Sequence, residues 1–422
     1  TADLLPWQGA ADIQRLSPVE ASARYLRHMR DAWNAQFKND PLQDQDVVLT
    51  LPASFDEVAR ELTVQAAAAA GLPRVVLIEE PQAAFYAWID KHHADWERRV
   101  EPGQKILVCD IGGGTTDFTL IRVRRGEGDK VQFHRVAVGD HLILGGDNQD
   151  LTLAKHLEER LGGNLQPHQW AVLVRICRRV KEDVLTDGCP PQVTFNLPGA
   201  GARLIGGGVR VDVDRDEVRR MLLDGFFPFA GLDDKPRKVQ SGFREFGLPY
   251  APDPAVTRYL AAFLTAHRHA GAEEAAGGQG RAGGPAPARP DIVLFNGGVF
   301  NSPLIRQRLL EVIESWFRAG DPDWSPIVLD NERLDLAVAY GAAYYGTVRR
   351  GRGVRIAAGL ARTYYIGVES DPPSAVCLVP GNAEPGQAID LVQRRFDLLV
   401  HQPAEFPLYV SSVRLTDAPG EL

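Results

Sequence analysis

The stretch that decides the fold is DIGGGTTD, residues 110–117, which follows the apolar run KILVC at 105–109. Three successive glycines let the backbone turn tightly and approach a ligand closely, because no Cβ stands in the way. The N–H groups of such a turn converge on an anion. Carboxylates at both ends, Asp110 and Asp117, are placed to hold Mg²⁺ directly or through water. A hairpin capped by aspartates is the alternative, but the buried strand and the paired carboxylates favour a phosphate site.

The glycine turn lies inside a predicted antiparallel meander. Strands are expected at 105–110, 115–123 and 131–138, with short turns between them. A helix is expected to begin near Asp147. The phosphate site is therefore predicted at the end of the first strand of a sheet.

The order strand, helix, strand, helix occurs twice, at 47–90 and at 291–346. In each copy an acidic residue and an Ala-rich helix follow the second strand: Glu80 in the first copy and Asp335 in the second. We interpret this as an internal repeat. The meander precedes the second copy, and residues 1–46 offer no equivalent for the first. We therefore expect that the front of the first lobe is absent.

The bulk composition excludes several classes of protein. A length of 422 residues predicts two or three domains. The formal net charge of −8 argues against a general nucleic-acid binder or a membrane-surface protein, and no apolar run has membrane-spanning length. The cysteines form no metal-binding pattern and are expected to be free thiols in a reducing cytosol. They are Cys109, Cys177, Cys189 and Cys377.

The remaining segments are predicted from periodicity and composition. Helices are expected at 17–37, 56–70, 168–185 and 214–224, and some strand near 192–213. An Ala/Gly/Pro-rich loop is expected at 271–290, and a basic linker near 349–355. The tail at 361–422 has short apolar runs broken by Pro and Gly, which predicts β structure.

Two further turns carry alternatives that the residues alone leave open. Glu79 and Glu80 precede a helix that starts at Pro81. Both carboxylates can simply favour a helix N-terminus, or one can face a cleft and position water. The segment 296–298, Asn-Gly-Gly, is an ordinary αβ turn, or its glycines let a sugar and base lie against the backbone. No Ser–His–Asp arrangement can be argued from spacing.

Six segments, in order along the chain, resemble the DnaK-type 70 kDa heat-shock chaperone family. The segments are VLTLPASF at 48–55, IEEPQAA at 78–84, DIGGGTTD at 110–117, LGGDNQD at 144–150, FNGG at 295–298 and AVAYGAA at 337–343.

The resemblance implies an α/β, actin-like (ribonuclease-H-like) two-lobed ATPase fold with ATP or ADP and Mg²⁺ in the cleft. It assigns Glu80 to the orientation of attacking water, and Asp110 and Asp117 to Mg²⁺ and water. Phosphoryl transfer needs mainly positioning and charge stabilisation, which such residues supply. The residues assigned to nucleotide binding are Gly112, Gly113, Gly114, Thr115, Gly145, Gly146, Lys181, Gly297, Gly298 and Asp335.

The chain also departs from the family pattern. Arg178 stands where an acidic residue is usual, and Glu182 where many members have a base-stacking cation. Residues 349–360 lack the acidic, leucine-rich linker of typical members. The expected domains are the remainder of lobe I at 1–100, lobe II at 101–348 with an inserted subdomain at about 162–260, the linker at 349–360, and the start of a β-rich peptide-binding domain at 361–422.

The function expected from the resemblance is that of a cytoplasmic chaperone ATPase that binds and releases unfolded peptides. The expected partners are hydrophobic client peptides, a J-domain co-chaperone and a nucleotide-exchange factor, without nucleic acid or membrane. Alternatives are a nucleotide-binding but weakly hydrolysing co-chaperone or scaffold, a sugar kinase on the same fold, and a filament-forming relative. Half of the phosphate cradle is expected to be missing, so we expect this piece to hydrolyse ATP poorly.

Overall fold

The computed structural model describes most of the chain. The described residues are 14–125, 131–163, 165–199, 208–237, 251–268, 289–318, 321–354, 356–357, 363–368, 374–381, 383, 389–391, 406–411, 414 and 417–422. The loop expected at 271–290 lies almost wholly outside them. No helix in these ranges is long and apolar enough to cross a membrane.

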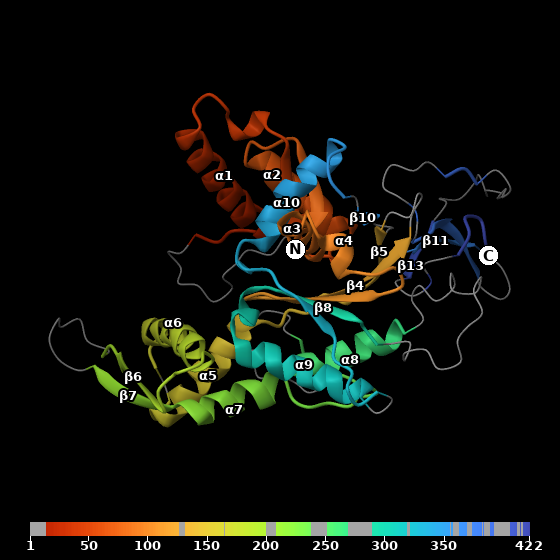
Figure 1. Ribbon diagram of the computed structural model, residues 1–422. Coiled ribbons are helices and arrows are strands. Elements are labelled where there is room, and N and C mark those ends of the chain that lie inside the picture. Colours follow the sequence, from red (N-terminus) through yellow and green to blue (C-terminus); the bar gives the residue numbers. More distant parts are fainter. Residues whose placement is uncertain are drawn as a thin grey trace.

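The first part of the chain builds a small helical layer on two parallel strands (Figure 1). Helix α1 begins where the sequence predicts it, because the Ser17 side chain accepts a hydrogen bond from the Glu20 N–H at 3.1 Å. The elements are α1 (Pro18–Gln36), η1 (Leu42–Asp44), β1 (Val47–Leu51), α2 (Glu57–Ala69), β2 (Val75–Glu79), α3 (Glu80–Lys91) and α4 (Trp96–Arg99).

A six-stranded sheet forms the middle of the molecule, in the order β10-β5-β4-β3-β8-β9. Its strands are β3 (Lys105–Ile111), β4 (Thr116–Arg125), β5 (Val131–Val138), β8 (Ile292–Asn296), β9 (Ile327–Leu329) and β10 (Ile356–Ala357). The pairs β3–β4 and β4–β5 are antiparallel, which confirms the predicted meander. Strand β8 runs parallel to β3 on its other side, so the two glycine turns lie at the same edge of the sheet.

Helices cover both faces of this sheet, and strand β3 shows why (Figure 1). Its side chains alternate between two cores: Leu107 and Cys109 face one, and Ile106 and Val108 face the other. The first core contains α5 (Gly146–Arg160), α6 (Pro167–Val184), α7 (Arg215–Phe226), α8 (Val256–Ala266) and α9 (Pro303–Phe317). The second contains α3, α4 and α10 (Ala337–Arg349). Helices α4 and α8 were not predicted from the sequence.

The two copies of the predicted repeat meet through their last helices. Helix α10 packs against α3 and β1, and a Cβ on Gly341 would overlap the carbonyl of Ala83. The structure thus places α10 on the first lobe, whereas residues up to 348 were assigned to the second. The segment 349–360, expected as a linker, contributes β10 to the central sheet beside β5. Sequence periodicity could not show this, because helix packing partners are set by tertiary contacts.

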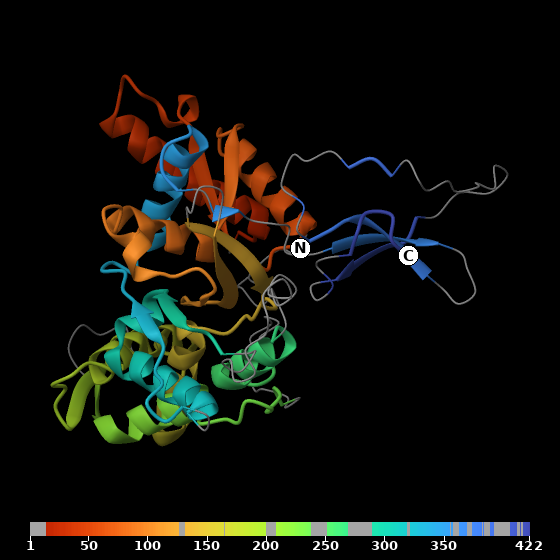
Figure 2. The same cartoon turned by 45° about the vertical axis from the view of Figure 1, so that its right-hand side comes forward.

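The remaining elements lie at the periphery. Strands β6 (Gln192–Leu197) and β7 (Val209–Asp214) pair antiparallel beyond α6, and η5 (Gly298–Asn301) precedes α9. A separate antiparallel sheet, β12-β11-β13, stands to one side of the two lobes (Figure 2). Its strands are β11 (Thr363–Val368), β12 (Ser374–Val379) and β13 (Leu408–Ser411). The tail is therefore β-rich, as predicted.

Candidate nucleotide and cation site

The glycine turn brings two carboxylates together. Asp110 near the end of β3 lies directly opposite Asp117 on β4 in the antiparallel register. Residues opposite each other in such a ladder project to the same face of the sheet. Both side chains are buried, and the turn between them closes with a 3.0 Å hydrogen bond from the Gly112 N–H to the Thr115 carbonyl. The sequence predicted this pairing.

Asp110 is held by a side chain from the neighbouring strand. Asn296 at the end of β8 donates from Nδ2 to Asp110 Oδ2 at 2.8 Å. Burial raises the pKa of Asp110 to about 6, the Asn296 hydrogen bond opposes this shift, and the charge of Asp117 adds to it. Within the described part of the chain, no donor reaches the buried Oδ1 of Asn296. A water or ligand donor would satisfy that oxygen.

The structure separates the roles of Glu79 and Glu80. Glu79 is buried and ion-paired with Arg60 at 2.6 Å and with Arg135. Burial lowers the pKa of Arg135 to about 10, with a smaller contribution from Arg60. This network is structural, because an unpaired carboxylate at this depth would be costly.

Glu80, the first residue of α3, belongs to the carboxylate site instead. The pKa of Glu80 is raised to about 7, mainly by burial and also by the charges of Asp110 and Asp117, whereas His141 opposes the shift. The charges of Asp110 and Asp117 thus act on Glu80, and the mutual repulsion of the three carboxylates favours a proton or a cation near them. Of the two interpretations of the Glu79–Glu80 pair, this arrangement favours the one in which a single carboxylate faces the cleft.

The start of α5 holds the glycine turn from behind. The Gly146 N–H donates to the Gly112 carbonyl at 3.0 Å, and the Asp147 N–H donates to the Gly113 carbonyl at 2.7 Å. The Gly145 N–H donates to the Asn148 side chain at 2.8 Å. The first N–H groups of this helix are therefore engaged within the protein. The structure gives Gly145 and Gly146 a packing role against the turn, beyond the nucleotide contact expected from sequence.

The second glycine pair lies beside the first. Gly297 has φ 88°, and a Cβ there would overlap the Ile111 carbonyl, so a side chain is excluded on both counts. Gly114 and Gly298 are exposed, and a Cβ on either would meet nothing within 4 Å. Thr115, which follows Gly114, is partly buried. Open space next to bare backbone is where a ligand can approach closely.

Lys181 on α6 lies behind the start of α5. Its ammonium group pairs with Asp150 at 2.6 Å and donates to the Gly146 carbonyl at 2.8 Å. Both side chains of the pair are buried. Lys181 therefore fixes α6 to α5 in this structure, and its ammonium group is bound by Asp150 and the Gly146 carbonyl.

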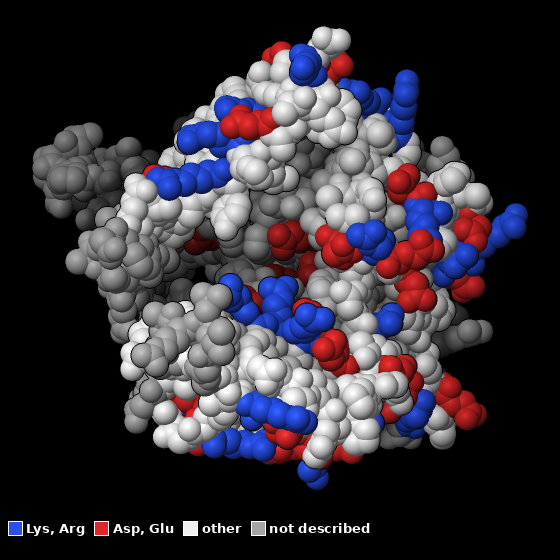
Figure 3. All heavy atoms as spheres, turned by 90° about the vertical axis from the view of Figure 1, so that its left-hand side faces the viewer, with Lys and Arg blue, Asp and Glu red and all other residues white. Residues whose placement is uncertain are grey.

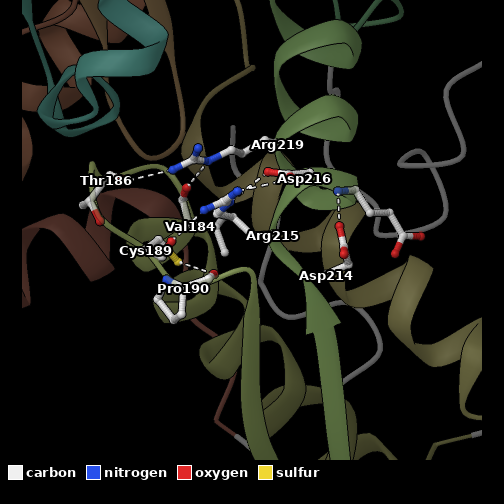
Figure 4. A network of polar contacts seen from close by, with 9 residues as sticks. Val184, Thr186, Cys189, Pro190, Asp214, Arg215, Asp216 and Arg219 are labelled. Atoms are coloured by element: carbon white, nitrogen blue, oxygen red, sulfur yellow. Dashed lines mark hydrogen bonds and ion pairs between the residues drawn. The ribbon is translucent and has the colours of Figure 1, made fainter.

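Helix α7 holds the far end of α6 in place (Figure 4). Arg219 donates to the Val184 and Thr186 carbonyls at 2.7 and 2.8 Å, and Arg215 donates to the Cys189 carbonyl at 2.9 Å. Cationic groups at a helix C-terminus bind its unsatisfied carbonyls and complement its dipole. This network therefore sets the position of α6 and of Lys181.

Asp335 lies elsewhere. It is exposed and ion-paired with Arg333 at 2.8 Å, just before α10. Arg333 lines a cavity of about 280 Å³ together with Ala87 and Asp90 of α3. Asp90 is roughly 15 Å along the helix from Glu80 at 1.5 Å per residue. The structure therefore does not bring Asp335 to the carboxylates, although the repeat gives it the position equivalent to Glu80.

The carboxylates fit a hard cation. A space-filling view shows a hollow between the lobes with acidic atoms on its floor (Figure 3). Within the described ranges, no group of three or more His, Cys, Asp or Glu side chains is arranged to bind a metal alone. Mg²⁺ usually takes one or two carboxylates and completes its shell with water and phosphate oxygens. Asp110 and Asp117 match that donor set.

Two positioning side chains were missed at the sequence level. The Asn296 side chain was overlooked beside its two glycines, although a buried polar residue at a strand end was the available signal. Ser54, buried in the turn after β1, donates to Asp117 Oδ1 at 2.7 Å. It is 63 residues from its partner, so no local pattern could reveal this contact.

Comparisons with known proteins agree with these motifs. Residues 7–184 match the family model described as Hsp70 protein. A "Chaperone protein HscA homolog" of Acinetobacter baumannii (strain AYE) is 34% identical over 173 residues, which cover 41% of this chain and 26% of the relative. The protein of the same name from Acidithiobacillus ferrooxidans (strain ATCC 53993) is 30% identical over 208 residues, 48% of this chain and 31% of the relative.

The chain thus spans between a quarter and a third of the length of these curated relatives. The matched region contains the carboxylates, the glycine turn and the start of α5. Residues 7–184 thus match the Hsp70 family, and the fold is the actin-like two-lobed ATPase fold of that family, followed by a β-rich region.

Proposed function

We propose that this chain is the nucleotide-binding part of a cytoplasmic Hsp70-type chaperone that binds ATP with Mg²⁺ and hydrolyses it. The observation that carries the proposal is the pairing of Asp110 and Asp117 at an open glycine turn, with the charges of both acting on Glu80. Three acidic groups around bare backbone N–H groups suit a magnesium–triphosphate ligand, in which the cation offsets the carboxylates and the phosphates take the N–H donors.

The proposed roles follow from the surroundings of each group. Asp110 and Asp117 hold Mg²⁺, which when bound neutralises charge on the phosphates. The turn from Gly112 to Thr115 cradles the phosphates, and Gly298 leaves space for the nucleoside. Glu80 accepts a hydrogen bond from the attacking water and orients it. Its pKa of about 7 is near the optimum for proton transfer at neutral pH.

The partners and domains are part of the same proposal. The two HscA homologues are named as chaperone proteins, which supports client peptides, a J-domain co-chaperone and a nucleotide-exchange factor as partners of the whole protein. The β11–β13 sheet is proposed as the start of the peptide-binding domain. The four cysteines are free thiols, consistent with a reducing compartment.

The test is a calorimetric titration of Mg-ATP into the longest gene product obtainable, beside Asp110→Ala and Asp335→Ala. We expect binding by the wild type and by Asp335→Ala, and at least tenfold weaker binding by Asp110→Ala, since loss of one cation ligand removes more than about 1.4 kcal/mol. Thermal unfolding of each variant checks that it is folded. Equal binding by all three would contradict a site at the glycine turn.

A weakly hydrolysing nucleotide-binding scaffold is the second candidate. It is favoured by α6, where Arg178 pairs with Glu182 at 3.4 Å and Lys181 is engaged by Asp150. These contacts engage the three residues that stand at base-binding positions of the family, two of which differ from the residue types usual there. Tight Mg-ATP binding without ADP formation in the presence of an unfolded peptide would support the scaffold; peptide-stimulated ADP formation would support the chaperone ATPase.

A further inference from the structure

A chain of hydrogen bonds leads away from Asp117 towards solvent. The Ser54 hydroxyl lies 2.7 Å from Asp117 Oδ1 and 2.7 Å from His141 Nδ1. Ser54 and Asp117 are buried, with exposed fractions of 8% and 3%, whereas the His141 side chain is 30% exposed. The imidazole also lies edge-on to Phe55, with ring centroids 5.7 Å apart.

The protons in this series of hydrogen bonds can be assigned from the chemistry of the three side chains. An ionised carboxylate only accepts, so the single hydroxyl proton of Ser54 is donated to Asp117. The contact between Ser54 Oγ and His141 Nδ1 then requires a proton on Nδ1, which His141 donates to the serine oxygen. The direction is therefore His141 to Ser54 to Asp117, and it fixes which ring nitrogen of His141 carries hydrogen.

This series of hydrogen bonds joins the two lobes. Ser54 and Phe55 lie in the turn after β1 of the first lobe, whereas Asp117 and His141 lie on β4 and before α5 of the second. A displacement of one lobe relative to the other of only about 1 Å would break hydrogen bonds of this length. The hydrogen bond to Asp117 is therefore present only when the lobes have the arrangement seen in this structure.

Asp110 has no such dependence. Its partner Asn296 lies on β8, paired with β3 in the same sheet. One carboxylate is thus oriented from within its own lobe and the other from across the cleft. In both cases one carboxylate oxygen is held by a neutral donor, which leaves the second oxygen for a cation or water.

We propose that Ser54 and His141 are positioning residues that orient Asp117 for ATP hydrolysis when the two lobes come together. The inference rests on the proposed function for the reaction itself. Neither residue touches the phosphates in this account; both act through Asp117. Loss of the hydrogen bond should therefore slow the chemical step and leave nucleotide affinity nearly unchanged.

The test compares the full gene product with three single variants of it: Ser54→Ala, Ser54→Thr and His141→Asn. Threonine keeps the hydroxyl, and asparagine places an N–H close to the position of Nδ1. We expect Ser54→Ala to reduce single-turnover ATP hydrolysis about tenfold, the effect of one lost hydrogen bond to a charged group, with a dissociation constant for Mg-ATP within about twofold of wild type. Ser54→Thr and His141→Asn, which keep the donor groups, should each retain most of the wild-type rate of hydrolysis.

The positioning role would be overturned if Ser54→Ala hydrolysed ATP at the wild-type rate. It would also be overturned if the variant lost as much affinity for Mg-ATP as it lost in rate. A wild type that neither binds nor hydrolyses Mg-ATP would instead overturn the proposed function. The two failures are separated by a measurement that needs no nucleotide, the ¹⁵N NMR signal of His141. We expect a proton on Nδ1 in the wild type and in Ser54→Thr, and its loss in Ser54→Ala; an Nε2 tautomer in the wild type would refute the hydrogen-bond chain.

Discussion

Two regions of the site use glycine for opposite reasons. In the seam, which we define as Gly145 and Gly297, backbone of another turn fills the space that a side chain would occupy. A Cβ on Gly145 would lie 2.5 Å from the Gly113 carbonyl oxygen and 2.6 Å from that of Gly112. At the lip, which we define as Gly114 and Gly298, a Cβ would meet nothing within 4 Å. The seam joins the turns of the fold, and the lip leaves backbone open to a ligand.

The seam should be the more sensitive region for stability. Gly145→Ala forces the start of α5 away from the glycine turn, since the blocking atoms are backbone and cannot rotate aside. We expect a loss of about 3 kcal/mol or more in the free energy of unfolding, as for other overpacked sites. Urea unfolding without nucleotide measures this loss. Gly114→Ala, the matched control at the lip, should change stability by less than about 0.5 kcal/mol; equal losses would abolish the distinction.

Lys181 tests whether the seam also depends on charge. Lys181→Met removes the partner of Asp150 and the donor to the Gly146 carbonyl, leaving a buried carboxylate unpaired. Breaking such a pair costs about 3 kcal/mol, which thermal unfolding detects. The double variant with Asp150→Leu should regain most of the stability. If Lys181→Met is instead as stable as wild type and binds Mg-ATP more weakly, Lys181 serves the ligand and not the seam.

Sequence reasoning predicted those parts of the fold that local pattern determines. The apolar run of β3, the glycine turn and the alternation in β4 and β5 specify the meander, and Asp110 and Asp117 follow from it. The strand–helix order of both repeat copies was also correct. These features depend on neighbours within about ten residues, which hydrophobic periodicity and turn chemistry report directly.

What could not be predicted depends on contacts across the chain. Glu79 and Glu80 are adjacent and chemically alike, and the ion pairs of Glu79 with Arg60 and Arg135 separate their roles. Asp335 was placed by analogy within the repeat, yet the geometry of α10 takes it away from the carboxylates. The Ser54–Asp117 hydrogen bond joins two lobes, and no spacing rule connects them.

The lip should affect ligand binding more than stability. Gly298→Ala adds a methyl group to the surface on which the nucleoside is proposed to lie, without contacting protein. We expect about tenfold weaker Mg-ATP binding, or about 1.4 kcal/mol, in calorimetric titration, with little change in unfolding. Gly225→Ala is the control, because this α7 glycine is equally open but lies outside the site. Weaker binding in both variants would mean that the lip has no special role.

The smallest expected effect concerns the carboxylates enclosed by the two regions. The pKa of Glu80 is raised from 4.5 to about 7, so between these values the folded state keeps a proton that the unfolded state has released. The stability from this group is present below about pH 4.5 and is lost as pH rises towards 7. Glu80→Gln should therefore stabilise the protein by about 1 kcal/mol at pH 8, and by much less at pH 5.

Urea unfolding at pH 5 and pH 8, with a chelator and without nucleotide, measures this difference. Glu61→Gln on the exposed face of α2 is the matched control and should behave like wild type at both values. A stabilisation of Glu80→Gln that is equal at both pH values would arise from packing and not from charge. A destabilisation at pH 8 would mean that the ionised Glu80 carboxylate has a favourable partner, and the repulsion among the three carboxylates would then no longer be the reason to expect a cation at the glycine turn.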